Sequence, residues 1–252
     1  MKIGAQLFTV REFCKDLDGF SETLKRVADI GYTTVQVSAV CEFDPKWLKR
    51  ELDRNGLQCV LTHTPAKKLE EDPYTAALEH SEYDCPRVGL GYFKFSEEEG
   101  HRYEDFLRYV RPMVENINRA GKYFMYHNHA SEFSRSEGTL VLERIAQDFA
   151  PEALGFTLDT YWIQAGGGDP AWWVEHFKGR VPCIHLKDFA FREGDKCMAP
   201  VGEGNINFDR VFEKAESSGT EYMLVEQDKC YGENPFDCLA RSYDFLKSRG
   251  FR

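Results

Sequence analysis

Two imidazoles and a carboxylate lie close together in the stretch YHNHASEF, residues 126–133. His127 and His129 come directly after an apolar run, and Glu132 follows three positions later. The chain has only 7 histidines in 252 residues, so a pair of them beside an acid is a candidate site for chemistry. Imidazole and carboxylate groups bind divalent metal ions and transfer protons near neutral pH.

Three further side chains of the same types each follow an apolar run elsewhere in the chain: Asp159, His185 and Glu226. Two carboxylates and one imidazole form an oxygen and nitrogen site that suits Mn²⁺, Mg²⁺ or Zn²⁺. A fourth ligand would come from Glu132 or His127. We expect Glu132, because a harder oxygen donor suits Mn²⁺ or Mg²⁺ better than a second imidazole does.

Each of these residues also has a structural interpretation without chemistry. Asp159 could cap a helix, since aspartate is a favoured N-cap residue. His185 could be a hydrogen-bonded core histidine and Glu226 a surface acid, while His63 and His129 could bond only to the backbone. The metal hypothesis therefore depends on the joint pattern and not on any residue alone.

The elements that must position these residues are short apolar runs that alternate with amphipathic segments. Uninterrupted runs rich in β-branched and aromatic residues are typical of strands buried on both faces of a parallel sheet. Helix starts are indicated where proline follows a capping residue, at Asp44-Pro45, Asp169-Pro170 and Asn234-Pro235. The predicted strands are residues 3–6, 34–37, 59–62, 88–91, 123–126, 156–158, 181–184 and 222–225.

Eight strand–helix units in about 250 residues predict an α/β protein, a single (β/α)8 TIM barrel that forms one domain over residues 1–252. The weakest part of this prediction is residues 64–87, where a proline interrupts a helical pattern. An open doubly wound sheet is the alternative, but no G-x-G-x-x-G follows the first strand. In a barrel the carboxyl ends of the strands meet at one rim, where the candidate residues would converge.

The composition limits the classes of partner. A formal net charge of −10 and a pI near 5.3 argue against a nucleic-acid partner, because phosphate binding draws on a basic surface. The chain has no run of 18 apolar residues and no signal-peptide pattern, so we expect no membrane span. The 8 cysteines form no C-x-x-C pair, which indicates reduced thiols in a cytoplasmic protein and no cysteine zinc site.

Two glycine-containing stretches have weaker functional interpretations. AGGGDP, residues 165–170, could bind an anion, although a turn into a helix start is the simpler prediction. PVGEGNINF, residues 200–208, follows the seventh strand, where some barrels bind phosphate. This stretch contains no lysine or arginine, which weakens the phosphate hypothesis, and a helix should begin near Asn207.

Several motifs together resemble the sugar phosphate isomerase/epimerase group of the xylose isomerase-like TIM barrels: YHNHASEF, LDTYWIQAGGGDP, RVPCIHLKDF, PVGEGNINF and YMLVEQD, with GAQLFTVRE and IGYTTVQVS near the start. The resemblance covers almost the whole chain and is poorest over residues 64–100. It implies one divalent metal, Mn²⁺ first with Mg²⁺, Co²⁺ or Zn²⁺ as alternatives, bound by Asp159, His185 and Glu226. Sugar epimerases of this superfamily usually carry a glutamate directly at the end of strand five, where this chain has His127.

The resemblance implies an isomerase or epimerase that acts on a small sugar, keto-sugar or cyclitol. A proton next to a carbonyl would be removed to give an enediolate, and Glu226 would act on one side of the substrate. The other side would be served by one residue of the strand-five stretch: His127, His129 or Glu132. Four side chains are expected to contact substrate: Gln36, His63, Trp162 and Lys187.

Three other functions were weighed against this one. A dehydratase or lyase acting on an oxidised sugar or inositol fits the HNH sequence after strand five. A non-catalytic sugar-binding barrel fits the absence of the usual strand-five glutamate. An apurinic endonuclease would need further histidines after Asp159 and after the seventh strand, and neither DTYW nor FREGDKCMAPVGEG contains one.

Overall fold

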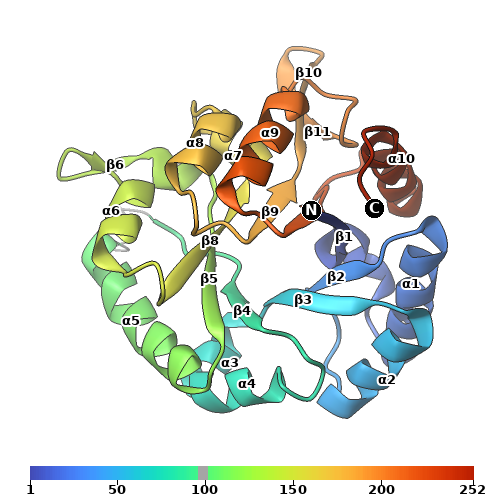
Figure 1. The fold of residues 1–252 in the computed structure, drawn as a ribbon, viewed down its shortest axis with the longest axis horizontal. Coiled ribbons are helices and arrows are strands. Elements are labelled where there is room, and N and C mark those ends of the chain that lie inside the picture. Colours follow the sequence, from blue (N-terminus) through green and yellow to red (C-terminus); the bar gives the residue numbers. More distant parts are fainter. Residues whose placement is uncertain (96–101) are drawn as a thin grey trace.

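The computed structural model describes residues 1–95 and 102–252, and within them eight parallel strands close into a barrel. Strands follow one another round the barrel in chain order, and the last strand pairs with the first. Helices surround this ring of strands (Figure 1), as the predicted (β/α)8 fold requires. The barrel strands are β1 (Lys2–Gln6), β2 (Thr34–Ser38), β3 (Gln58–His63), β4 (Arg87–Leu90), β5 (Tyr123–His127), β8 (Leu154–Asp159), β9 (Cys183–Leu186) and β12 (Tyr222–Val225).

The helices begin where the sequence places capping residues. Asp44, Asp169 and Asn234 each accept hydrogen bonds from backbone amides of the first turn, and proline follows each of them. The helices are α1 (Leu17–Ile30), α2 (Pro45–Asn55), α3 (Ala66–Glu71), α4 (Pro73–Glu79), α5 (Tyr103–Arg119), α6 (Val141–Asp148), α7 (Thr160–Ala165), α8 (Pro170–His176), α9 (Phe208–Ser218) and α10 (Pro235–Ser248).

The region predicted least well is two helices and not one broken helix. Asp72 ends α3 and caps α4 by accepting from the Thr75 amide, and Pro73 occupies the first position of α4. The sequence patterns did not predict the 3₁₀ segments η1 (Leu7–Phe13) and η2 (Ala130–Phe133). They also did not predict the hairpins β6 (Arg135–Ser136) with β7 (Thr139–Leu140) and β10 (Asp188–Arg192) with β11 (Asp195–Ala199).

An apolar layer lies inside the barrel below the candidate residues. Side chains two positions apart in a strand share a face. Leu61, Met125, Cys183 and Leu224 form part of one buried cluster. Each lies two positions before a candidate residue: His63, His127, His185 and Glu226. The candidate side chains therefore stand on the same strand faces as this apolar cluster, one layer nearer the carboxyl ends.

Two other expectations concern residues outside the site. All 8 cysteines are free thiols, and Cys59 and Cys183 are fully buried. Within the described part of the chain, no helix is both long enough and apolar enough to cross a membrane.

Candidate active site

A cavity of about 530 Å³ opens at the carboxyl ends of the barrel strands. Its volume lies within the usual range for small-molecule sites, roughly 300–1,000 Å³. Phe8, Leu90 and Tyr92 form part of its apolar wall. The titratable side chains that line it are His63, His127, His129, Lys187, Glu226 and Asp228.

Four side chains from four strands form one buried cluster beside this cavity. His127, Asp159, His185 and Glu226 each offer one ligand atom, and these atoms all lie within 4.8 Å of one another. Strand pairing brings two of them together directly, because Asp159 of β8 is in register with His185 of β9. All four side chains are buried.

Each imidazole of the cluster is fixed through the nitrogen that faces away from it. His127 donates from Nδ1 to the Gly91 carbonyl at 2.9 Å, and His185 donates from Nε2 to Gln36 Oε1 at 2.6 Å. Carbonyl and amide oxygens only accept hydrogen bonds, so these contacts place a proton on His127 Nδ1 and on His185 Nε2, and the other nitrogens, His127 Nε2 and His185 Nδ1, face the cluster. A hydrogen bond to the second nitrogen is the usual way in which a protein orients a metal-binding histidine.

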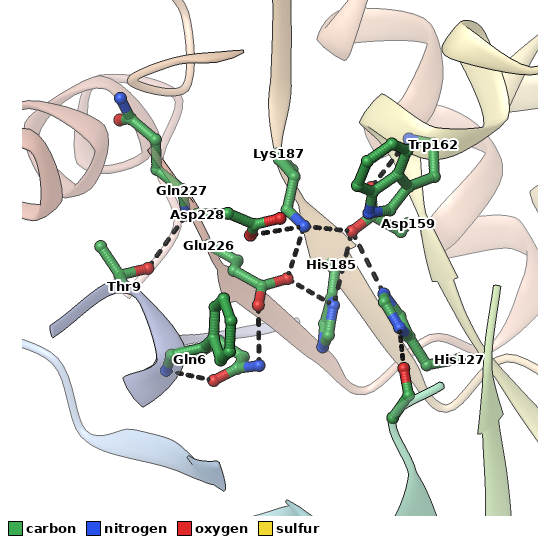
Figure 2. Close-up of polar contacts among 12 residues, drawn as sticks. Gln6, Thr9, His127, Asp159, Trp162, His185, Lys187, Glu226, Gln227 and Asp228 are labelled. Atoms are coloured by element: carbon green, nitrogen blue, oxygen red, sulfur yellow. Dashed lines mark hydrogen bonds and ion pairs between the residues drawn. The ribbon is translucent and has the colours of Figure 1, made fainter. Parts of the chain in front are cut away.

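The two carboxylates are held in the same manner. Asp159 Oδ1 accepts from the Trp162 amide at 3.0 Å, and Glu226 Oε1 accepts from Gln6 Nε2 at 2.8 Å. Asp159 therefore caps α7 with one oxygen, as the structural alternative predicted, and still directs Oδ2 towards the cluster. Glu226 Oε2 faces the cluster likewise (Figure 2).

One cluster atom, His185 Nδ1, lacks a hydrogen-bond partner. Glu226 Oε2 lies 3.0 Å from this nitrogen and is ion-paired with the Lys187 ammonium. Buried polar atoms without partners are rare because each costs the free energy of its lost hydration. This nitrogen, together with the two carboxylates and the second imidazole, fits a divalent cation.

Lys187 places its ammonium group among three acids. Its Nζ lies 2.9 Å from Asp159 Oδ2, 2.9 Å from Glu226 Oε2 and 2.8 Å from Asp228 Oδ1 (Figure 2). Burial alone would lower the pKa of Lys187, but these carboxylates raise the pKa above its usual range. The lysine therefore stays charged and partly neutralises the acidic cluster.

The same contacts shift the pKa values of the cluster in opposite directions. Burial would raise the pKa of Glu226, but Lys187 and His185 lower it well below its usual range. Burial would lower the pKa of His185, yet Glu226 and Asp159 raise it. The carboxylates therefore remain ionised at neutral pH, as metal binding requires.

His129 lies at the cavity wall next to the cluster. Burial and the neighbouring His127 lower its pKa to about 3, so the imidazole is uncharged at neutral pH. Its ring packs on Trp162, with ring centroids 5.0 Å apart. Trp162 itself is not among the residues that line the cavity; it supports His129 and lies near the Lys187 ammonium.

Glu132, which we expected as the fourth ligand, lies outside the cluster. Its carboxylate accepts from the Tyr126 hydroxyl at 2.6 Å, the Ser131 hydroxyl at 2.7 Å and the His129 amide at 3.0 Å. It is fully buried, and burial raises its pKa to about 7 although these hydrogen bonds lower it. His127 lies in the cluster instead.

Other expected and unexpected residues surround the cluster. Gln36, expected to contact substrate, is fully buried and holds His185 instead. His63 lines the cavity as expected. Gln6, Asn128 and Asp228 were not given roles from the sequence, although each is a polar residue at the end of a barrel strand or within three residues after it. Asn128 Oδ1 accepts from the Asp159 amide at 2.9 Å and so joins β5 to β8.

Comparisons with known proteins agree with this fold. A family model described as xylose isomerase-like TIM barrel matches residues 24–249. L-ribulose-5-phosphate 3-epimerase UlaE of Salmonella paratyphi A is 28% identical over 131 residues. That match covers 46% of this chain and 45% of the relative, so less than half of the relative's length is matched.

Two solved structures show the same fold. A sugar phosphate isomerase/epimerase from Parabacteroides distasonis superposes with a TM-score of 0.82 at 24% identity, covering 98% of this chain and 93% of that one. The probable 3-DHS dehydratase AsbF from Bacillus anthracis superposes with a TM-score of 0.73 at 16% identity, covering 99% and 100%. At these identities the likeness concerns the fold alone.

Proposed function

Since this chain belongs to the xylose isomerase-like TIM barrel family, we propose that it is a metal-dependent isomerase or epimerase acting on a small sugar or keto-sugar. One observation carries the proposal. Four metal-type side chains each have one polar atom fixed by the scaffold and the other atom directed into a shared cluster at a cavity of sugar size.

The residues that would hold one divalent ion are His127, Asp159, His185 and Glu226. Their mixed oxygen and nitrogen donors suit Mn²⁺, with Mg²⁺, Co²⁺ or Zn²⁺ as alternatives. When bound, such an ion supplies Lewis-acid stabilisation of negative charge that develops on a substrate oxygen. This ligand set replaces Glu132 by His127, because the Glu132 carboxylate is already bound by three donors.

Two groups at the cavity are suited to move the proton next to a carbonyl. Glu226 is ionised and reaches the cavity, so its carboxylate can accept a proton from carbon. His129 lines the cavity and its Nδ1 has no hydrogen-bond partner, so this nitrogen is placed to exchange a proton with the substrate on a second side. Lys187 presents a charged ammonium that can bind a hydroxyl or an enediolate oxygen.

Deuterium exchange tests the proposal directly. The purified protein, supplied with Mn²⁺, is incubated in D₂O with a panel of ketopentoses, ketohexoses and keto-cyclitols, and each product is analysed by NMR. We expect deuterium at the carbon beside the carbonyl of at least one sugar, and none with the Asp159→Asn variant. Loss of water from an oxidised substrate would favour the dehydratase alternative. Binding of sugars without exchange or turnover across the panel would favour a non-catalytic barrel.

A further inference from the structure

The loop after β9 forms a backbone cradle that is filled by a side chain of the same chain. Asp188 is fully buried. Its Oδ2 accepts from the amides of Gly202 at 2.9 Å and Gly204 at 2.8 Å. Its Oδ1 accepts from Phe189 at 2.8 Å and Ile206 at 3.3 Å. Four convergent backbone amides are the arrangement with which proteins bind phosphate, and here all four are bound to one carboxylate.

The loop lies so close to this carboxylate that no second anion fits between them. A Cβ atom added to Gly204 would lie 2.3 Å from Asp188 Oδ1 and 2.4 Å from the Phe189 carbonyl oxygen. Glycine is therefore required where the backbone approaches Asp188. The loop after the seventh barrel strand is a frequent phosphate site in TIM barrels, and in this chain Asp188 occupies the amides that such a site would use.

The charged residues of the cavity also disfavour the binding of a phosphate group. Lys187 is the one lysine or arginine that lines the cavity in the described part of the chain, and three carboxylates already surround its ammonium. A phosphate dianion would therefore lie beside ionised acids, and among the described residues that line the cavity it would find no lysine or arginine free of carboxylate partners.

We propose that the substrate is an unphosphorylated carbohydrate and that Asp188 determines this specificity, a proposal that rests on the proposed function. The Asp188 carboxylate takes the place of a substrate phosphate on the amides of residues 202–206. The phosphate group of a phosphorylated sugar would have to displace the Asp188 carboxylate, or it would have no hydrogen-bond donors. A neutral sugar has hydroxyl groups that match the imidazole and hydroxyl groups of the cavity.

Matched substrates test the specificity. Each ketopentose and ketohexose of the panel is assayed beside its terminal phosphate ester, and kcat/KM is compared within each pair. We expect kcat/KM for the free sugar to exceed that for its ester by about tenfold or more, because a site discriminates strongly against a charged phosphate group that it cannot supply with hydrogen-bond donors. A phosphate ester that is used as well as, or better than, its free sugar overturns the proposal.

A second measurement does not depend on turnover. Thermal unfolding of the wild-type protein, Asp188→Ala and Asp188→Asn is followed with inorganic phosphate and with chloride at equal ionic strength. We expect phosphate to leave the wild-type melting temperature unchanged relative to chloride, since the amides are occupied. Asp188→Ala should melt lower and regain part of the loss in phosphate, since its amides are vacated. Asp188→Asn, which keeps one acceptor oxygen in the cradle, should regain less.

The substrate assay and the melting experiment together distinguish failure of the proposed function from failure of the Asp188 specificity proposal. Failure of every sugar to react contradicts the proposed function, while the phosphate titration still decides whether the loop amides are available. Phosphate that stabilises the wild-type protein as much as Asp188→Ala overturns the inference, and so does an Asp188→Ala variant that phosphate does not stabilise. If Asp188→Ala cannot be purified, the wild-type response to phosphate decides alone.

Discussion

His127 Nε2 lies 3.2 Å from Asp159 Oδ2, although the two residues are 32 positions apart in the chain. The contact exists because β5 pairs with β8 and places both side chains at the barrel rim. The Gly91 carbonyl holds the other nitrogen of His127 at 2.9 Å. His127 therefore presents its free nitrogen to the acid cluster, in the place where we had expected Glu132.

Metal content should follow this arrangement. We expect the purified protein to bind close to one divalent ion per chain, and His127→Ala and Asp159→Ala to lose it, because each removes a ligand atom. Glu132→Ala should keep the ion and melt at a lower temperature, since it leaves buried donors unpaired. Elemental analysis and thermal unfolding of the three variants check this. Retention of metal by His127→Ala with loss by Glu132→Ala would reverse the assignment.

Glu226→Gln should separate metal binding from proton transfer. The variant keeps one oxygen that can face the metal, but it replaces the other oxygen, which accepts from Gln6, by an NH2 group and loses the basic carboxylate. We expect turnover and deuterium exchange to fall by about 10²-fold or more, the usual scale for general acid–base catalysis. Circular dichroism should show an intact fold. Glu175→Gln, on the surface and paired with Lys214, is the control and should keep full turnover. A Glu226→Gln variant with normal exchange excludes Glu226 as the base.

Removing the Lys187 charge should destabilise the metal-free protein. Lys187→Met leaves three carboxylates without their common cation, and breaking a buried ion pair typically costs about 3–5 kcal/mol. A divalent ion would compensate for the lost charge, so Mn²⁺ should raise the melting temperature of Lys187→Met more than that of the wild type. The control is Lys214→Met, whose ion pair with Glu175 is partly exposed. Equal melting temperatures of wild type and Lys187→Met after chelation would contradict this.

His80 should make the protein less stable in mild acid. It is buried, its Nδ1 donates to the Ala76 carbonyl at 2.7 Å, and its Nε2 lies 2.8 Å from the Thr62 hydroxyl. Burial lowers its pKa to about 4. The unfolded chain therefore binds a proton that the native protein does not bind between about pH 6.5 and pH 4.

Stability should accordingly fall as pH falls through that window, by about 3 kcal/mol for this residue. His80→Gln removes the titrating group, so it should be less stable than the wild type at pH 7 and lose less stability on acidification. Urea unfolding at several pH values between 4 and 7 measures how the free energy of unfolding of each protein changes with pH. If the free energy of unfolding changes with pH equally in the wild type and in His80→Gln, His80 does not cause the loss of stability in acid.

The sequence by itself determined the barrel and the places where its site residues lie along the chain. The patterns that predicted the barrel are local: continuous apolar runs, helix caps such as Asp44 and Asn234, and the spacing of the strand–helix units. Local patterns can be recognised from the sequence without a structure. The rule that polar residues follow buried strands located Asp159, His185 and Glu226 as candidate ligands. It gave no role to Gln6, which donates to Glu226, or to Asp228, which pairs with Lys187.

Only the tertiary structure decided which atoms meet. His127 shares a strand face with Met125 and turns into the barrel, whereas Tyr126 faces outward onto Phe106 of α5. Glu132 lies beyond the end of β5, in η2, and binds the Tyr126 hydroxyl instead of the cluster. The path of a chain after it leaves a strand depends on packing against distant elements, so residue order near His127 could not show this.

The same reason separates Asp188 from its neighbour Lys187. Both follow β9, but the lysine reaches three acids from other strand ends, while the aspartate binds amides of a loop that begins more than ten residues later. The sequence placed a glycine-containing loop in a common phosphate position. Whether the loop amides are free to bind a ligand depends on the folded structure, because their hydrogen bonds to Asp188 form only when folding brings the two segments together.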